Sequence, residues 1–450
     1  MTLHVVNPAT EAVIAELEQA GIDEADEAVS RAKAAGPAWR AVAPEDRGRL
    51  LRRVATLVEE HAEELARVES ENVGKPIAAA RGEVAMVARV FHFYAGAVDK
   101  HGGSEIPVAG GIDVTFREPL GVVGLIVPWN FPLNIASWKL GPALACGNTV
   151  VLKPAELTPL SALRLSELIL DAGIPEGVVN VLVGKGSIVG RRLAEHPDVA
   201  KIGFTGSTLI GRDVMRAAAG TIKRVTLELG GKSANVVFED ADLDRAASSA
   251  PDAVFDNAGQ DCCARSRILV QRSVYDEFLE RLVAAASRVR VGDPRDDATE
   301  MGPLISAGHR ETVASFVDDD VAFRGDTPDG PGFWFPCTIV EASNDDRVAR
   351  EEVFGPVAAV IPFEDEADAV RLANDTPYGL SGSVWTRDVA RALRMVRAID
   401  SGVISVNSNT SVRVQTPFGG FKQSGFGREL GLQGLEGYSE LKNVYISTAG

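Results

Sequence analysis

The sequence predicts an α/β protein with two successive layers of parallel strands and helices. Between residues 122 and 229, short β-branched apolar runs such as VVGLIV, TVVLKP and KIGFTG alternate with amphipathic stretches. A second alternation follows, from SANVVF to GVISVNS. Strands that are buried on both faces and alternate with helices are typical of βαβ units around a parallel sheet.

The expected elements follow in chain order. Residues 23–71 are expected to be helical, because Leu50, Val54, Leu57 and Leu65 fall at helical spacing between charged residues. Ile112 and its alternating neighbours predict a half-buried strand, and SELKNVYIST is also expected to be extended. The first alternation then predicts the strands VVGLIV, TVVLKP, VVNVLVG, KIGFTG and RVTLEL, and the helices LSALRLSELILDAG, SIVGRRLAEH and STLIGRDVMRAAAG. The second predicts the strands SANVVF, SRILV, PVAAVIPF, SGSVWT and GVISVNS, and the helices YDEFLERLVAAASRVRV, EADAVRLAND and DVARALRMVRAI, with a surface loop over 318–333.

Composition and charge exclude several classes of protein. The 450 residues suggest about three domains or subdomains. The formal charge of −17 argues against a nucleic-acid partner, although a local nucleotide pocket remains compatible with it. The longest apolar stretch, residues 120–152, is interrupted by Pro128, Asn130, Lys139 and other polar or proline positions, so no membrane span is expected.

The four cysteines predict working thiols in a reducing compartment. Cys146, Cys262, Cys263 and Cys337 include no CxxC pair, and adjacent cysteines rarely form a disulfide. The N-terminus lacks a basic segment followed by an apolar run, so secretion is not expected. A cytoplasmic location follows as the expectation.

Cys262 is the first candidate for chemistry. It lies in a polar, glycine-containing segment just before the expected strand SRILV, whereas a buried inert cysteine is usually found in an apolar run. Arg265 and Arg267 are expected to favour its thiolate, and Cys263 is expected to point away and pack. A Cys–His hydrolase remains an alternative, but the histidines lie outside any companion motif.

Other candidates lie at the ends of expected strands. Glu228 ends RVTLEL, where a carboxylate is either paired or has a pKa raised by burial, and only the second suits a general base. Lys153 and Glu156 follow TVVLKP, where they are suited to ribose hydroxyls or to a surface salt bridge. The small residues from Gly206 to Gly211 could hold a pyrophosphate at a helix N-terminus, and Asn130 offers an amide donor in a proline-rich turn.

Taken together, these segments resemble the aldehyde dehydrogenase superfamily, of the non-CoA-acylating type. The motifs VPWNFPL, KPAELTP, GFTGST, LELGGKS, NAGQDCCARSR, EEVFGP, NDTPYGLSGSV and PFGGFKQSGFGRELG occur in that family's order over nearly the whole chain. The resemblance implies that Cys262 adds to an aldehyde, that Asn130 holds the oxyanion, and that Glu228 activates the water that hydrolyses the thioester. Lys139 and Glu429 resemble residues of a proton relay from that base.

The resemblance also implies the binding residues and a cofactor. The positions that match cofactor contacts are Pro128, Trp129, Lys153, Glu156, Gly186, Gly206, Ser207, Gly211, Leu229, Glu352 and Phe354. Glu156 is expected to favour NAD over NADP, because its charge repels a 2′-phosphate. The substrate side is expected to contain Phe131, Trp138, Asp261 and Phe418, and no metal is expected.

The nature of the aldehyde stays open. Asp261 resembles a residue of enzymes that take ω-aminoaldehydes, whereas Arg413 would favour a carboxylated semialdehyde, and Asp261 could instead pair with Arg265 or Arg267. A CoA-acylating dehydrogenase and a catalytically inactive binding protein are further alternatives. The intact Glu228 argues against the first, because thiolysis needs no water-activating base, and the intact Cys262, Glu228 and Asn130 argue against the second.

The implied architecture is the aldehyde dehydrogenase fold, with a Rossmann-like cofactor domain, a second α/β catalytic domain and a small β oligomerisation arm. The dinucleotide-binding domain is expected over 1–100 and 119–229, and the catalytic domain over 230–412. The arm is expected from 101–118 and 437–450, and residues 413–436 return with a substrate-pocket loop. Such an arm implies a homodimer or homotetramer.

Overall fold

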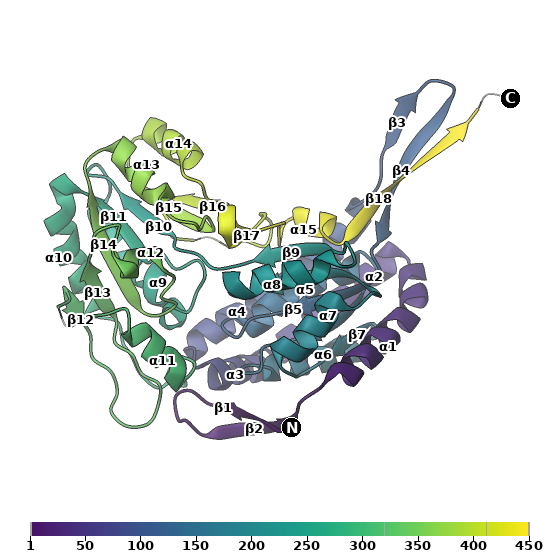
Figure 1. Ribbon diagram of the computed structural model, residues 1–450, viewed down its shortest axis with the longest axis horizontal. Coiled ribbons are helices and arrows are strands. Elements are labelled where there is room, and N and C mark those ends of the chain that lie inside the picture. The colour runs from purple at the N-terminus through teal and green to yellow at the C-terminus, as the bar shows by residue number, and fades with distance from the viewer. Residues whose placement is uncertain (1, 319, 411, 449–450) are drawn as a thin grey trace.

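A computed structural model describes residues 2–318, 320–410 and 412–448. Residues 1, 319, 411, 449 and 450, which belong to the expected domains, loop and arm, lie outside this description. The chain forms two α/β halves side by side, each with its own sheet, and a narrow β ribbon that projects from one of them (Figure 1). None of the helices in the described ranges combines the length and the apolar character that a membrane span requires.

The first half contains a six-stranded sheet. Its strands lie in the order β17 (Gly425–Phe426), β9 (Arg224–Glu228), β8 (Val199–Thr205), β5 (Val122–Ile126), β6 (Thr149–Lys153) and β7 (Val179–Val181). Only β17, which returns from the end of the chain, is antiparallel to its neighbour in this sheet. The strand expected at VVNVLVG is present as β7, which has only three residues.

Helices cover both faces of this sheet. One face packs on α2 (Pro44–Glu60), α3 (Ala62–Val73), α4 (Ile77–Ala97), α5 (Pro132–Ala145) and α6 (Leu160–Asp171). The other packs on α1 (Ile22–Ala41), α7 (Arg191–Glu195) and α8 (Thr208–Ala219). The segment SIVGRRLAEH, expected to be one helix, instead begins with a π-helical turn over Gly186–Gly190.

The second half contains a seven-stranded sheet. Its order is β12 (Phe323–Arg324), β13 (Thr338–Glu341), β14 (Val357–Phe363), β11 (Arg267–Gln271), β10 (Ala234–Val237), β15 (Ser381–Trp385) and β16 (Val403–Val406). Its helices are α9 (Leu243–Phe255), α10 (Tyr275–Ala286), α11 (Ala307–Ala314), α12 (Arg347–Arg350), α13 (Glu366–Asn374) and α14 (Val389–Ala398). The helix expected to run through SRVRV ends at Ala286, because Val291 beyond it forms a β-bridge with Met301. The loop expected over 318–333 includes the short strand β12.

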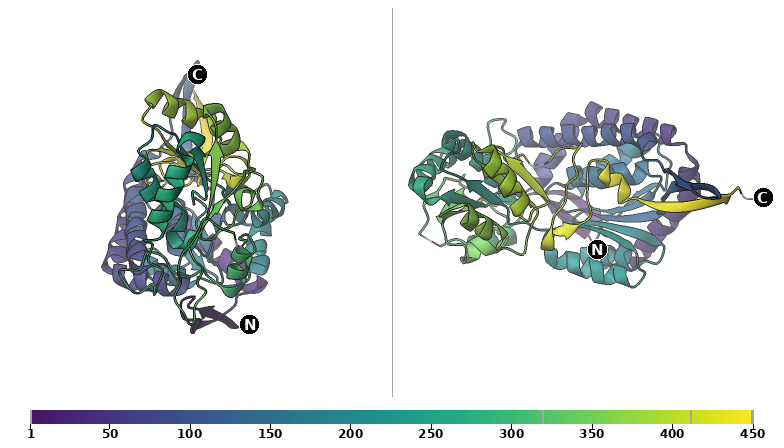
Figure 2. Two further views of the ribbon diagram at one scale, coloured as in Figure 1. Left: turned by 90° about the vertical axis from the view of Figure 1, so that its left-hand side faces the viewer. Right: turned by 90° about the horizontal axis from the view of Figure 1, so that it is seen from above.

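Two smaller sheets complete the fold. At the N-terminus, β1 (Thr2–Val6) pairs with β2 (Val13–Glu18). The projecting ribbon contains β18 (Ser439–Ser447), β4 (Gly111–Pro119) and β3 (Glu105–Val108), all antiparallel (Figure 2). The short helix α15 (Gln433–Glu436) precedes β18 and packs on α5.

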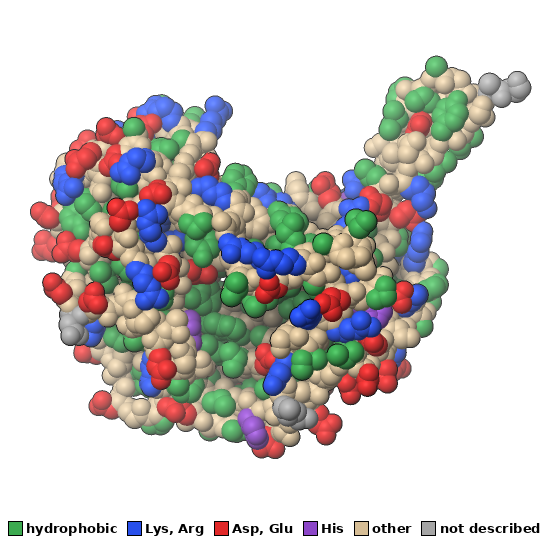
Figure 3. Space-filling model, viewed as in Figure 1, with side chains coloured by type: hydrophobic (Ala, Val, Ile, Leu, Met, Phe, Trp, Pro, Cys, Tyr) green, Lys and Arg blue, Asp and Glu red, His purple; other side chains and the backbone are tan. Residues whose placement is uncertain are grey.

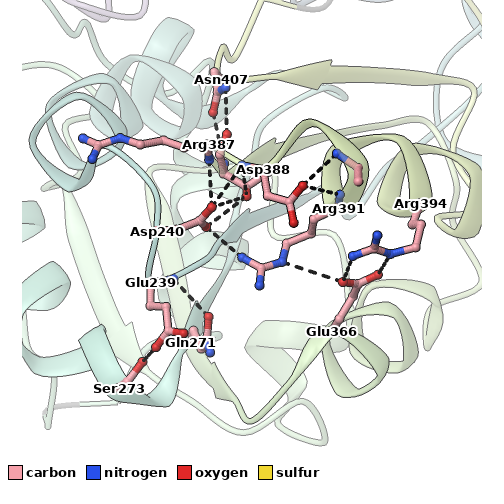
Figure 4. A network of polar contacts seen from close by, with 12 residues as sticks. Glu239, Asp240, Gln271, Ser273, Glu366, Arg387, Asp388, Arg391, Arg394 and Asn407 are labelled. Carbon is pink, nitrogen blue, oxygen red and sulfur yellow. Dashed lines mark hydrogen bonds and ion pairs between the residues drawn. The ribbon is translucent and has the colours of Figure 1, made fainter.

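A half-buried carboxylate joins α14 to the second sheet. Asp240 accepts hydrogen bonds from the Thr386 hydroxyl at 2.8 and 2.9 Å and from two backbone N–H groups, of Arg387 and Asp388, and it also contacts the Arg391 guanidinium at 2.8 Å (Figure 4). Although burial is the largest single effect and raises the pKa of Asp240, the hydrogen bonds and Arg391 outweigh it, so this pKa is lowered. The Asp240 carboxylate thus fixes the start of α14.

Asp240→Ala is expected to lower the free energy of unfolding by about 2–3 kcal/mol, because several donors lose a charged acceptor. Since the folded-state pKa is lowered, the contribution is present above the unfolded pKa of about 4 and is lost as the pH falls through the folded value. Urea denaturation at pH 7 measures the change, with the exposed Asp329→Ala as control. Equal midpoints for the two variants would contradict this role.

Candidate active site

Cys262 lies in the loop that leads into β11. The backbone before it turns sharply, because Asn257, Ala258 and Gly259 have positive φ angles of 50°, 56° and 69°. Gln260 holds this turn: its Nε2 donates to the Asn257 carbonyl and its Oε1 accepts from the Ile305 N–H, both at 2.9 Å. These contacts place Cys262 in the lining of a cleft between the two halves, visible as a hollow in Figure 3.

The side chain of Cys263 lies beside that of Cys262. The two Sγ atoms and a carboxylate oxygen of Asp261 all lie within 4.8 Å of one another. The expectation that Cys263 points away is therefore wrong. The reason is local: Asp261 Oδ1 accepts a hydrogen bond from the Cys263 N–H at 2.9 Å, and this turn brings both thiols to the same side.

The pKa of the Cys262 thiol is raised well above its usual value. The hydrogen bond with the Cys263 thiol has the largest effect, followed by burial and by the electrostatic influence of the neighbouring Cys263, Asp261 and Glu352. The expectation that the nearby arginines favour a Cys262 thiolate is thus wrong. Cys262 is a protonated thiol until another group accepts its proton.

The two arginines have structural contacts. Arg265 donates to the Ser381 hydroxyl at 2.8 Å and to the Ser383 hydroxyl at 3.1 Å, which ties the cysteine loop to β15. Arg267 donates to backbone carbonyls, including that of Ala373 at 2.9 Å. Arg265 lies near enough to lower the pKa of Asp261, but burial is the larger effect and the pKa of Asp261 is raised.

Asn130 is held next to the cysteine loop. Its Nδ2 donates to the Gln260 carbonyl at 2.9 Å, so the side-chain amide of Asn130 contacts the backbone two residues before Cys262. Its own carbonyl accepts from Lys75 Nζ and from Asn257 Nδ2, both at 3.1 Å. Lys75 and Asn257 therefore connect the loop after β5 with the cysteine loop.

Glu228 is the last residue of β9 and is only 4% exposed. Among the residues that the structure describes, neither of its carboxylate oxygens has a hydrogen-bond partner. Burial raises its pKa well above the usual value, and the charge of Glu429 adds to this, whereas Lys139 and Arg428 act in the opposite direction. Of the two alternatives for this carboxylate, the structure favours the raised pKa over a structural pairing.

Lys139 and Glu429 form a buried ion pair at 2.7 Å, with side-chain exposures of 0% and 1%. Lys139 comes from α5, and Glu429 from the returning segment, where its backbone pairs with Phe418 through two hydrogen bonds of 2.8 Å. A Cβ on Gly419, the residue after Phe418, would lie 2.8 Å from Glu228 Oε1, so the segment that carries Glu429 runs beside that carboxylate. The three expected residues of the relay are thus brought together.

The cleft has a volume of about 420 Å³. Twelve of the expected site residues line it: Pro128, Trp129, Asn130, Phe131, Lys153, Glu156, Gly206, Ser207, Leu229, Cys262, Glu352 and Phe354. It also has apolar lining that the sequence analysis did not single out, from Ile126, Ile135, Phe204 and Ile210. A cleft of this size with few polar groups is typical of a small-molecule site.

One end of the cleft fits a dinucleotide. Ser207 caps the N-terminus of α8, where exposed N–H groups favour a phosphate, and its Oγ accepts from the Ile210 N–H at 3.4 Å. Glu156 Oε1 accepts from the Gly186 N–H at 3.2 Å, so this carboxylate is held at the cleft edge. Lys153 donates to the Pro154 carbonyl at 3.0 Å. Gly211 lies one turn into α8, where a Cβ would come within 2.5 Å of Leu229.

Glu352 connects the far end of the cleft to the cysteine loop. Its Oε1 accepts from the Gly231 N–H at 2.9 Å, and burial raises its pKa to about 7. A Cβ at Gly231 would lie 2.2 Å from the Cys262 carbonyl oxygen, so only glycine fits between the two. Phe354, at a φ of 56°, packs edge-on against Trp129 with ring centroids 5.3 Å apart.

The aromatic residues expected on the substrate side lie in or against the hydrophobic core of the first half. Phe131, Trp138 and Phe418 belong to the same hydrophobic cluster as Cys262. The rings of Trp138 and Phe418 meet edge-on at 5.2 Å, and the Trp138 N–H donates to Asn134 Oδ1 at 3.0 Å. Arg413, the alternative contact for a carboxylated substrate, is exposed.

Sequence reasoning missed the residues that hold the site together. Lys75, Asn257, Gln260 and His309 contact site residues that are distant in sequence, and His309 does so through the Phe354 carbonyl at 2.7 Å. Asn257 and Gln260 carried a local signal, because both belong to the cysteine motif NAGQDCCARSR. Lys75 lies in a helix-to-helix connection without any pattern of its own.

Comparisons with known proteins found similarity over nearly the whole length of the chain. The Aldehyde dehydrogenase family model matches residues 1–444. The chain is 42% identical over 459 residues to the betaine aldehyde dehydrogenase of Bacillus subtilis, covering 99% of this chain and 94% of that protein. It is 44% identical over 455 residues to an aldehyde dehydrogenase of Emericella nidulans, covering 99% and 91%.

Solved structures of similar proteins have nearly the same fold as this chain. PnpE from Pseudomonas sp. WBC-3, in complex with nicotinamide adenine dinucleotide, has a TM-score of 0.98 and 46% identity, covering 100% of this chain and 95% of that chain. A betaine aldehyde dehydrogenase from Staphylococcus aureus in complex with NAD+ has a TM-score of 0.97 and 38% identity, covering 100% and 92%. With the expected motifs gathered around one cleft, the chain belongs to the aldehyde dehydrogenase family.

Proposed function

We propose that this protein oxidises an aldehyde to its carboxylic acid with NAD, through a covalent intermediate on Cys262. The observation that carries the proposal is that Cys262 lines the same cleft as the N-terminus of α8, with the buried Glu228 close to the cysteine loop. A nucleophile, a dinucleotide-binding turn and a base of raised pKa are the parts that this reaction needs. The relatives named aldehyde dehydrogenases, and those solved with NAD, support the same conclusion.

The first steps use the cysteine and asparagine loops. The Cys262 thiol gives its proton to a water molecule and its sulfur adds to the aldehyde carbon, which leaves a negative oxygen on the former carbonyl. Asn130, by its match to the family motif, donates its amide to this oxyanion together with the Cys262 N–H. Bound in the cleft, NAD supplies the acceptor for the hydride of the aldehyde carbon. Trp138 and Phe418 keep bulk water away from the aromatic side of the pocket.

Glu228 then acts on the resulting thioester. Its carboxylate takes a proton from a water molecule as the water oxygen adds to the thioester carbon. The C–S bond breaks, Cys262 leaves as a thiolate, and the carboxylic acid departs. CoA-acylating chemistry would replace that water by a thiol, which needs no base of raised pKa, so Glu228 favours hydrolysis.

The aldehyde itself is proposed from two features. Asp261, whose carboxylate lies beside both thiols, would favour an ω-aminoaldehyde by attracting a distal ammonium group. Arg413 lies exposed on the returning segment and would favour a semialdehyde that carries a carboxylate. The apolar lining of the cleft, which includes Phe131 beside Cys262, suits the apolar part of either substrate.

A panel of aldehydes tests the proposed function. NADH formation is followed at 340 nm with 4-aminobutyraldehyde, succinate semialdehyde and benzaldehyde, with and without CoA, and the product is identified as acid or thioester. NADH formation with a free acid as product is expected for at least one aldehyde. The proposal fails if no aldehyde reduces NAD, and acyl-CoA as the main product would establish the alternative.

Glu156→Gln tests the choice between NAD and NADP. The carboxylate held by Gly186 at the cleft edge is expected to bind ribose hydroxyls and to repel a 2′-phosphate. The variant is expected to shift the ratio of kcat/KM for NAD over NADP by about 10- to 100-fold toward NADP. The exposed Glu167→Gln, on α6, serves as control, and an unchanged ratio in Glu156→Gln would remove this role.

A homodimer or homotetramer is part of the proposal. The ribbon of β18, β4 and β3 carries exposed apolar side chains: Ile106, Val108, Ile112, Phe116, Leu441, Tyr445 and Ile446. Exposed strand edges with apolar residues are usually covered by a partner. All four cysteines, which lie in the described ranges, carry free thiols, and this supports a reducing compartment such as the cytoplasm.

A further inference from the structure

A polar stripe crosses one face of the first sheet behind Glu228. Thr205, Gly203 and Lys201 alternate along β8, and the paired positions on β9 are Glu228, Thr226 and Arg224. Side chains at alternate positions of a strand lie on the same face. The neighbouring positions Ile202, Phe204 and Leu227 belong to the hydrophobic cluster of the opposite face. Strands buried in a parallel sheet are normally apolar on both faces, so this stripe needs an explanation.

Several buried polar atoms along the stripe are unpaired. In the described part of the chain, Thr205 Oγ1, Glu429 Oε2 and Tyr438 Oη, like both oxygens of Glu228, have no hydrogen-bond partner. A Cβ on Gly203 would lie 3.2 Å from Tyr438 Oη and 3.6 Å from Lys139 Cδ. These two side chains therefore border the space that the missing side chain of Gly203 leaves open. Buried polar atoms in such number are normally bridged by ordered water.

Lys201 lies at the end of the stripe that is remote from Glu228. It is 1% exposed, and its Nζ donates to Thr226 Oγ1 at 2.5 Å and lies 4.8 Å from the centre of the Tyr438 ring. The charged or titratable groups that face it are Glu429 and Tyr438 from the returning segment, Lys139 from α5, and Arg224 from β9. Burial, with the charges of Lys139 and Arg224, lowers the pKa of Lys201 to about 8, although Glu429 acts in the opposite direction.

In the proposed reaction, a proton that leaves Glu228 needs a route to solvent. Each turnover adds one proton to Glu228, which must lose it before the next water can be activated. Lys139 and Glu429 are almost fully buried, so a proton that reaches them has not yet reached solvent. Beyond Lys201, the stripe ends at Arg224, which is exposed and pairs with Glu440 on β18.

We propose that Lys201 carries the proton of Glu228 from the Lys139–Glu429 pair toward solvent, along the polar stripe formed by β8 and β9. Lys201 acts through other groups and touches neither aldehyde nor dinucleotide. In its neutral form it accepts a proton at Nζ through bridging water, as Glu429 or Lys139 gives one up. It releases the proton at the Arg224 end, so each group returns to its starting state. This inference rests on the proposed function.

Lys201→Met tests the route, because methionine keeps the length of the side chain but cannot hold a proton. At pH 7 and low buffer concentration, kcat is expected to fall by about 10- to 100-fold. The first turnover, seen as a burst of NADH in stopped flow, is expected to keep its rate, because it precedes the proton release. Added imidazole at constant ionic strength is expected to restore kcat, since a small buffer can carry the proton instead.

Two further variants separate proton transfer from charge and from folding. Lys201→Arg keeps the charge but does not release its proton, so it is expected to behave like Lys201→Met. Thr226→Val removes the hydrogen-bond acceptor of Lys201 without changing the size of the side chain, and is expected to lower kcat by about 3- to 10-fold. It keeps the inference testable if the Lys201 variants do not fold.

Lys223→Met is the matched control. The pKa of Lys223 is also lowered to about 8, mainly by burial, but its Nζ donates to the His196 carbonyl at 2.6 Å, away from the stripe. Its kcat and buffer dependence are expected to equal those of the wild type. The inference is wrong if Lys201→Met keeps wild-type kcat, if imidazole does not restore it, or if Lys201→Arg restores it. If the wild type itself forms no NADH from any aldehyde, the proposed function fails instead.

Discussion

Replacing Cys262 by serine is expected to lower the rate of NADH formation by about 10⁴-fold or more. The sulfur is the atom that forms and breaks the covalent bond in the proposed reaction, and a serine hydroxyl has too high a pKa to replace it without a dedicated base. The change is conservative in size, and Cys262 is only partly buried, so the fold is expected to be retained. Steady-state NADH formation with the best aldehyde of the panel measures the effect.

Cys263→Ser is the matched control for Cys262→Ser. The two thiols lie side by side, but only Cys262 lines the cleft. Cys263→Ser is therefore expected to keep kcat within about threefold of the wild type. Comparable losses in the two variants would show that the dithiol acts as a unit and would contradict a single nucleophile.

A third variant, Cys263→Ala, tests the electrostatics of the site. The hydrogen bond with the Cys263 thiol is the largest cause of the raised pKa of Cys262. Removing that thiol in Cys263→Ala is thus expected to lower the pKa of Cys262. Alkylation by iodoacetamide, followed from pH 7 to pH 10, should then rise at lower pH in the variant than in the wild type.

The parts of the fold that have strong local patterns could be predicted from the sequence. KIGFTG and RVTLEL are nearly continuous apolar runs, and both form parallel strands, β8 and β9. The residues at their ends, Glu228 and Ser207, were identified because a turn or a motif marks them. Where a helix ends depends on tertiary contacts, and the bridge between Val291 and Met301 stops α10 earlier than its periodicity suggests.

The contacts that set the chemistry of the site could not be predicted in this way. Arg265 and Arg267 follow Cys262 closely in sequence, but both guanidinium groups are buried, and they donate to the Ser381 hydroxyl on β15 and to the Ala373 carbonyl on α13. Cys263 faces Cys262 because of one hydrogen bond to Asp261. Such contacts depend on side-chain direction, which sequence spacing in a loop does not determine.

The polar stripe behind Glu228 illustrates a different limit. Lys201 and Thr226 stand in short apolar runs, where each looks like an isolated exception to the pattern. Only the register of β8 and β9, which places Gly203 opposite Thr226 and Thr205 opposite Glu228, shows that the exceptions share one face. Strand register is a long-range property, so the stripe becomes visible only in the folded chain.

Glu228→Gln is expected to lower steady-state kcat by about 10³-fold while leaving the first turnover nearly intact. The thioester forms without Glu228 in the proposed reaction, so a burst of NADH equal to the enzyme concentration should precede the slow phase. Glutamine has nearly the same size as glutamate, and in the described part of the chain the carboxylate has no hydrogen-bond partner to lose. Stopped-flow absorbance at 340 nm separates the two phases.

The pH dependence of kcat provides a second measurement on the same variant. Burial raises the pKa of Glu228 well above its usual value, so the carboxyl is protonated at low pH and cannot accept a proton from water. In the wild type, kcat is therefore expected to rise with pH as Glu228 ionises, in a pH range well above that of an ordinary glutamate. This rise should be absent in Glu228→Gln, whose amide does not titrate there.

Adding a thiol to Glu228→Gln tests whether Glu228 acts as the base or has only a structural role. CoA or another thiol attacks a thioester without the help of Glu228, so adding one to Glu228→Gln should restore turnover by releasing an acyl thioester instead of the acid. The exposed Glu364→Gln, which alters a surface pair with Arg272, is the control and should keep wild-type kcat. If the first turnover of Glu228→Gln slows as much as the steady state, Glu228 acts before the thioester forms, as the base that takes the proton of Cys262.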